Sequence, residues 1–141
     1  MTTDHVIGLV SRIREKANAL ILVELERRGH PELSPSHGAI LKWLYEEGPL
    51  PMGVLAKKIG RQKNTVTTLI RKLERTGYVE RNTDSHDNRV QRICLTEKGQ
   101  AFRSDFDAIS ELLLTAVWGD MEQAQKEHLV AGLERILHNL K

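Results

Sequence analysis

The chain has 141 residues, of which 40% are hydrophobic and 28% charged, with a formal net charge of +2. This composition is typical of a single globular domain and argues against a disordered chain. No apolar run reaches the roughly 20 residues that cross a bilayer, and the N-terminal segment lacks the pattern of a secretory signal. Cys94 is the only cysteine, which excludes an intramolecular disulfide framework and leads us to expect a cytoplasmic protein.

Positive charge is concentrated in one stretch of the chain. Residues 57–92 carry ten Lys or Arg and four acidic residues, a net charge of +6, whereas the rest of the chain carries −4. A basic segment on an acidic scaffold is the electrostatic footprint expected of a DNA-binding protein.

Four helices are predicted in the first half of the chain. Apolar residues recur at helical spacing over residues 5–28, and the Ser-Pro pair at 34–35 predicts a second helix that ends at the Gly-Pro pair at 48–49. A short helix is expected over 52–59, with Val54, Leu55 and Ile59 facing inward. The fourth is expected over 61–76, closed by Gly77 as a left-handed cap.

Two strands and two more helices are predicted in the second half. Alternating residues favour strands at 78–81 and 91–95, joined by a loop long enough to project from the body. One long helix is then expected from 96 to about 118. Residues 120–123 have the pattern of a capping box, which predicts that a last helix begins there.

This order of elements predicts a winged helix-turn-helix, mainly α with a small β-hairpin. We expect a single domain over 1–141, with the winged helix-turn-helix at 34–99 and dimerisation helices at 1–33 and 100–141. The apolar stripes on the outer helices need a partner surface. Packing within the chain would supply one, but a two-fold dimer would also place two recognition helices one DNA turn apart on a palindrome.

The helix predicted over 61–76 is amphipathic and is the candidate recognition helix. Its apolar face consists of Val66, Leu69, Ile70 and Leu73. Side chains from its first half are expected to read base edges in the major groove: Gln62, Lys63, Asn64, Thr65, Thr67 and Thr68. The cations Lys63, Arg71, Lys72 and Arg75 suit phosphates, which fix register without reading sequence. A solvated amphipathic helix is the alternative interpretation.

The loop before the second strand carries Arg89 near a polar tip. A guanidinium on a projecting hairpin can enter the narrow minor groove of A/T-rich DNA. Asp87 would be repelled by phosphate, so we expect it to orient an arginine rather than contact DNA. A solvated turn with an incidental arginine remains the alternative.

Motifs of other chemistries are missing from the sequence. It contains no P-loop, nucleophile elbow, HExxH motif or dinucleotide-binding fingerprint, so we predict that the protein is not an enzyme and needs no cofactor. Asp84, His86 and Asp87 form the only local cluster of metal-ligand types, and a solvated wing is favoured over a metal site. Cys94 is interpreted as structural rather than reactive.

Aromatic residues are few, and four of them have two possible roles. Trp43, Phe102, Phe106 and Trp118 either line a ligand crevice or anchor the core. We favour the core.

Three segments together resemble the MarR (multiple antibiotic resistance regulator) family. They are LAKKIGRQKNTVTTLIRKLERTGYVER at 55–81, the D-x-x-D-x-R pattern of Asp84, Asp87 and Arg89, and LTEKG at 95–99. The resemblance follows the helix order over nearly the whole chain. It implies a bacterial or archaeal transcriptional regulator, with a homodimer built from the first and last helices that represses a palindromic operator. It also implies a crevice between the dimerisation and DNA-binding parts for a small, often aromatic or phenolic, effector.

Several positions depart from the family pattern. Thr68 stands where an arginine is common, His86 where the wing often has a basic residue, and Gln62 where a serine often caps the recognition helix. The operator sequence therefore does not carry over. The first helix also lacks the cysteine of peroxide-sensing members. The alternative function is a winged-helix protein-interaction module without specific DNA binding, against which the cations of the recognition helix argue.

Overall fold

The computed structural model describes residues 2–141 and is mainly helical with one small sheet, which confirms the expected fold class. No helix within these residues is long and apolar enough to span a bilayer. The elements in chain order are α1 (Val6–Arg27), α2 (Pro35–Glu47), β1 (Leu50–Pro51), α3 (Met52–Ile59), α4 (Lys63–Arg75), β2 (Val79–Thr83), β3 (Gln91–Leu95), α5 (Glu97–Ala101), α6 (Arg103–Trp118) and α7 (Gln123–Asn139).

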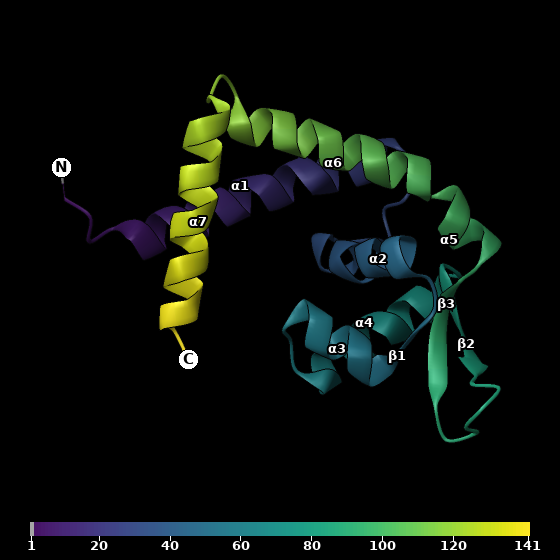
Figure 1. The fold of residues 1–141 in the computed structure, drawn as a ribbon. Helices are drawn as coiled ribbons and strands as arrows, with labels where there is room; N and C mark the ends of the chain where they lie inside the picture. The colour runs from purple at the N-terminus through teal and green to yellow at the C-terminus, as the bar shows by residue number, and fades with distance from the viewer. Residues whose placement is uncertain (1) are drawn as a thin grey trace.

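The elements form an elongated arm and a compact body (Figure 1). Helices α1 and α6 pack along each other and make the arm. Helices α2, α3 and α4 and the sheet make the body, and the β2–β3 hairpin projects from it. Helix α7 leaves the end of α6 that is far from the sheet.

The core lies mainly in the body. Its fully buried side chains are Ile40, Leu41, Leu44, Leu55, Val66, Ile70, Leu73, Tyr78 and Ile93. Helix α4 thus buries the face that its sequence predicts, although Leu69 is only partly buried. Val54, expected to face inward, is 38% exposed, because Leu55 and Ala56 occupy the core-facing positions of this short helix.

Helix α4 begins later than expected. Gln62 is its N-cap, with an extended backbone (φ −64°, ψ 146°), so the helix starts at Lys63 rather than at 61. At its other end Gly77 has a φ of +88°, which confirms the left-handed turn and is a conformation that favours glycine. The amide of Tyr78 then donates to the Leu73 carbonyl at 2.9 Å and fixes the exit of the chain.

Two expectations about the later helices are wrong. The single long helix is divided at Phe102, because the backbone there (φ −69°, ψ −17°) forms a local turn between α5 and α6; its ring is buried against His30, with ring centroids 4.6 Å apart. The N-cap of α7 is Glu122, whose amide donates to Gln125 Oε1 at 3.0 Å. The preceding residues 119–121 instead form a turn in which the amide of Met121 donates to Trp118.

The sheet has a third strand that the sequence did not predict. The strand order is β1-β3-β2, with every pair antiparallel, and β1 pairs Leu50 with Ile93. A two-residue strand is too short to show an alternating pattern. Strand β2 runs on to Thr83, opposite Gln91, so the connecting loop covers only 84–90.

The arm and α7 leave a large apolar surface exposed within the single chain. Helix α7 has no buried residue, and its Leu133 and Leu137 are 43% and 72% exposed. The exposed apolar side chains of α1, α6 and α7 include Ile7, Val10, Ile13, Leu112, Leu114, Val117, Leu129, Val130, Leu133, Ile136, Leu137 and Leu140, which we call the outer apolar surface.

Candidate nucleic-acid interface

The first turns of α4 present most of the predicted base-reading side chains to solvent. Gln62, Lys63, Asn64, Thr65 and Thr68 are exposed, and Thr67 is half-buried. The hydroxyls of Thr67 and Thr68 donate to the carbonyls one turn earlier, at 2.8 and 3.0 Å. These bonds fix the threonine rotamers and use the hydroxyl protons within the helix. The two side chains therefore present only methyl groups and acceptor lone pairs to solvent.

The predicted phosphate-binding cations of α4 are also exposed. Arg71, Lys72 and Arg75 all point away from the core. Glu74 is the sole acidic residue of the helix, and its Oε1 lies 3.0 Å from Nε of Arg81 on β2. Because Arg81 compensates this carboxylate, the exposed face of α4 remains cationic.

The hairpin loop brings Arg89 to a solvent-exposed position. The Arg89 side chain is 90% exposed, and its Nε lies 3.2 Å from Asp87 Oδ1. The same carboxylate oxygen accepts from the backbone amide of Arg89 at 3.0 Å. Hydrogen bonds from the amide and then the guanidinium of Arg89 hold the pKa of Asp87 below its usual value. Asp87 therefore makes the expected contact with an arginine.

A second acid–arginine pair, at the base of the loop, was missed from the sequence. Asp84 Oδ1 accepts from the amide of His86 at 2.7 Å, and its Oδ2 lies 2.9 Å from a terminal nitrogen of Arg92 on β3. These two bonds, in that order, lower the pKa of Asp84. The strand register would have revealed the pair, because Asn82 lies opposite Arg92 and Asp84 follows two residues later.

The loop cluster and the cysteine have ordinary local partners. The carboxylates of Asp84 and Asp87 are bonded to arginines and loop amides, and within residues 2–141 no three His, Cys, Asp or Glu side chains are placed so that they could hold a metal ion. Cys94 is partly buried, with the side-chain nitrogen of Asn82 3.3 Å from its sulfur. Its neighbour Ile93 is fully buried, as the predicted alternation requires.

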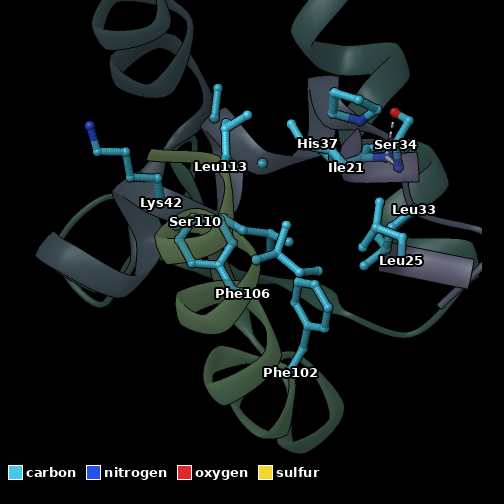
Figure 2. Close-up of a pocket in the computed structure, with 15 residues that line it drawn as sticks. Ile21, Leu25, Leu33, Ser34, His37, Lys42, Phe102, Phe106, Ser110 and Leu113 are labelled. Carbon is cyan, nitrogen blue, oxygen red and sulfur yellow. Dashed lines mark hydrogen bonds between the residues drawn. The ribbon is translucent and has the colours of Figure 1, made fainter. Parts of the chain in front are cut away.

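A cavity of about 250 Å³ lies between the arm and the body, bounded by α1, α2 and α6 (Figure 2). Apolar side chains dominate its wall, with Lys42 and Ser110 among the few polar groups. Phe102 and Phe106 both line it, and Phe102 is also a core residue. Trp43 and Trp118 do not line it: Trp43 packs on the core beneath Lys58 Nζ, and Trp118 lies beside α7.

The short helix α3, the exposed helix α4 and the three-stranded sheet with its projecting hairpin define the winged helix-turn-helix class. The MarR family model matches residues 33–90 of the chain. The winged helix-turn-helix part of the chain is thus similar to the MarR family in sequence.

Comparisons with known proteins agree with this similarity. The transcriptional regulator SarZ of Staphylococcus haemolyticus is 33% identical over 85 residues, which are 60% of this chain and 56% of SarZ, so the match spans little more than half of that relative. The structure of a MarR regulator from Methanosarcina mazei Go1 superposes with a TM-score of 0.80 at 24% identity, over 97% of this chain and 96% of that one. A second similar structure, at 19% identity and a TM-score of 0.78 over 94% and 98% of the chains, concerns regulation of DNA binding of Bordetella bronchiseptica BpsR by 6-hydroxynicotinic acid.

Proposed function

We propose that the protein is a sequence-specific DNA-binding regulator that acts as a homodimeric repressor of a palindromic operator in the bacterial or archaeal cytoplasm. One observation carries the proposal. The exposed face of α4 combines amide, hydroxyl and cationic side chains, and its one acid is compensated. A helix with this surface suits the major groove, where base edges and phosphates are reached together.

Each group on this face has a role in the proposal. Asn64 and Gln62 suit adenine, with which an amide pairs bidentately, and the threonine methyls suit thymine. Arg71, Lys72 and Arg75 bind phosphates and set the register. Arg89 enters the adjacent minor groove.

The rival function is a winged-helix module that binds another protein. Such a module needs no cationic reading face. The recognition helix in this chain carries four exposed cations, which favours DNA.

Base reading and phosphate anchoring are separable by mutation. We expect Asn64→Ala to weaken binding to DNA from upstream of its own gene by about 1–3 kcal/mol and to leave binding to scrambled DNA unchanged. Arg75→Ala, the matched variant about three turns away on the same helix, should weaken both about equally, because phosphates carry no sequence. Fluorescence anisotropy at fixed salt measures both. The proposed assignment is wrong if the two variants behave alike on both DNAs, and wild type that binds neither DNA favours the protein-binding alternative.

The outer apolar surface supports the dimer. Helix α7 buries none of its side chains within its own chain, and an apolar stripe of this kind is stable in water only when covered. We propose that residues 1–33 and 100–141 cover it by pairing with a second copy. The winged helix-turn-helix at 34–99 is then presented twice, as a palindrome requires.

The cavity between the arm and the body supports an effector site. Its apolar wall, with Ser34, His37, Lys42 and Ser110 as polar groups, suits a small aromatic acid or phenol. A ligand there would change DNA affinity only to the extent that it prefers one arrangement of arm and body. BpsR, with DNA binding regulated by 6-hydroxynicotinic acid, is a structural relative.

Filling the cavity tests the effector site. Gly38 lines it, and a Cβ there would meet only Phe106 Cε2, at 3.9 Å. We expect 6-hydroxynicotinic acid, benzoate or phenol to weaken DNA binding of the wild type by about tenfold, and Gly38→Leu to bind DNA normally but resist release. Equal release of wild type and variant would place the ligand elsewhere, and no release by any compound would remove the effector from the proposal.

A further inference from the structure

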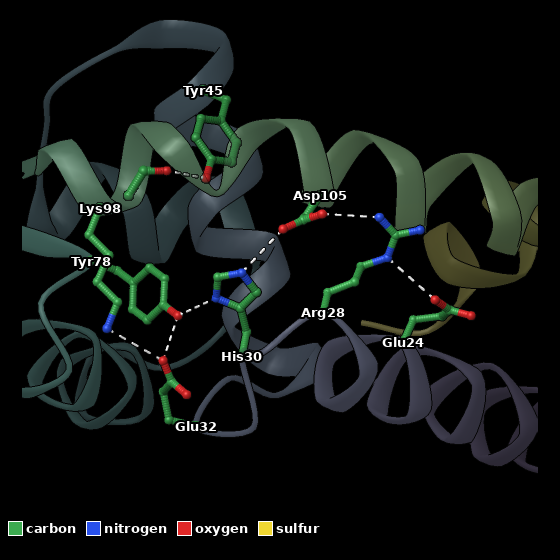
Figure 3. A network of polar contacts seen from close by, with 9 residues as sticks. Glu24, Arg28, His30, Glu32, Tyr45, Tyr78, Lys98 and Asp105 are labelled. Carbon is green, nitrogen blue, oxygen red and sulfur yellow. Dashed lines mark hydrogen bonds and ion pairs between the residues drawn. The ribbon is translucent and has the colours of Figure 1, made fainter.

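A chain of polar contacts joins the arm to the corner between α4 and β2 (Figure 3). His30, in the loop after α1, is at its centre. Its Nδ1 lies 2.7 Å from the hydroxyl of Tyr78, and its Nε2 lies 3.2 Å from Oδ2 of Asp105 on α6. Tyr78 is fully buried and stands between Gly77, at the end of the recognition helix, and the first residue of β2.

The partners of His30 fix the direction of each hydrogen bond. The Tyr78 hydroxyl donates its single proton to Glu32 Oε1, 2.5 Å away, so towards His30 it can only accept. Burial favours the protonated acid at Glu32, but the bonds from Tyr78 and Lys98 outweigh it and hold its pKa below the usual value. Burial, and then the bond to Glu32, raises the pKa of Tyr78, so the hydroxyl keeps its proton.

The other side of His30 imposes the same requirement. Asp105 Oδ1 accepts from Arg28 at 3.0 Å, and Arg28 in turn bonds Glu24 on α1. A carboxylate paired with arginine is an acceptor only, so Nε2 of His30 must donate to it. Both ring nitrogens of His30 therefore have to carry protons.

We propose that His30 is a proton-operated latch that holds the α4–β2 corner against the arm when the imidazole is doubly protonated. A neutral ring has one N–H: with it on Nε2 the ring keeps Asp105, but Nδ1 then needs the Tyr78 proton, and Glu32 loses that donor. Histidine is the residue type that changes charge between pH 5 and 8, so the latch is tested by comparing pH 6 with pH 8. The ionisable and charged groups around it are Asp105 from α6, Arg28 and Glu24 from α1, Glu32 from the loop, Tyr78 before β2 and Lys98 from α5. The edge of Phe102 closes the remaining side.

The latch predicts a specific pH dependence of stability. The doubly protonated ring makes one more hydrogen bond than the neutral ring, so its contribution is present at pH 6 and reduced at pH 8. We expect His30→Gln to raise the unfolding constant about tenfold more at pH 6 than at pH 8. In a Tyr78→Phe background, which keeps the ring and removes the acceptor, that difference should become smaller, because only the His30–Asp105 pair then depends on the proton. His86→Gln, in the exposed loop, is the matched control and should show no such difference.

A direct readout keeps the latch testable if a variant fails to fold. In the wild type, the ¹⁵N signals of the His30 ring at pH 6 should be those of an imidazolium with both nitrogens protonated. A neutral single tautomer at pH 6, or a His30→Gln penalty equal at both pH values, overturns the proposal.

Coupling to DNA rests on the proposed function and is measured separately. Tyr78 follows the recognition helix after only Thr76 and Gly77, and its amide donates to Leu73 in that helix. A proton on His30 therefore biases how α4 is held, and DNA must reciprocally bias that proton. The ratio of Kd values at pH 6 and pH 8 for DNA from upstream of its own gene should therefore differ between wild type and Tyr78→Phe. Equal ratios overturn this coupling. Absence of DNA binding at either pH counts against the proposed function alone, since the NMR and unfolding results still decide the latch.

Discussion

Gly99→Ala is expected to destabilise the fold by about 3 kcal/mol or more. Gly99 is buried in α5, and a Cβ built on it would lie 2.2 Å from the Tyr78 carbonyl oxygen and 3.1 Å from Leu95 Cδ2. A backbone oxygen cannot rotate away as a flexible side chain can. The same carbonyl accepts from the amide of Thr96 at 3.1 Å, and the Gly99 carbonyl accepts from the buried Tyr45 hydroxyl at 2.6 Å. Relief of the clash would therefore strain these bonds.

Chemical denaturation of Gly99→Ala and Gly53→Ala measures this effect. Gly53 lies on the exposed side of α3, and a Cβ there meets no atom within 4 Å. Alanine at this helical position should be neutral or stabilising by up to about 1 kcal/mol. If the two variants were equally stable, α5 would not approach the sheet as closely as described.

Leu133→Asp is the second substitution with a large expected effect. Leu133 belongs to the outer apolar surface and is 43% exposed in the single chain. In the proposed dimer an aspartate there would be buried without a partner, at a cost of several kcal/mol. We expect a shift from dimer to monomer at micromolar concentration, with loss of helix content and of operator binding, measured by sedimentation and circular dichroism.

Ala124→Asp is the matched control, because it adds the same charge to the same helix. Ala124 is exposed in the first turn of α7, where an acid is favoured by the helix dipole. This variant should remain dimeric. A Leu133→Asp protein that is still a dimer and still binds operator would contradict the proposed pairing.

The sequence predicted those parts of the molecule that are encoded in local periodicity. The buried face of α4 follows from the helical spacing of Val66, Ile70 and Leu73, and the left-handed turn after α4 follows from Gly77. The exposed residues of the recognition helix follow from the same spacing, because residues opposite a buried face point to solvent.

The features that the sequence did not predict depend on tertiary packing. The division between α5 and α6 arises where Phe102 packs on His30, 72 positions away in the chain. The partners of His30, Tyr78 and Asp105, are 48 and 75 positions away. No local pattern marks such partners, and their roles as donor and acceptor become readable only when the atoms are in place.

If the wing enters DNA as proposed, the Asp87–Arg89 pair makes that step an exchange of partners for Arg89. The Arg89 guanidinium already has a carboxylate partner in the free protein, so any contact with DNA replaces one anionic neighbour by another. The free energy gained by this exchange is small on ordinary duplex DNA. It is larger where a narrow minor groove concentrates negative potential. In the proposed complex Asp87 competes with DNA for the Arg89 guanidinium. The competition lowers the affinity of the wing for DNA in general and increases its preference for a narrow minor groove.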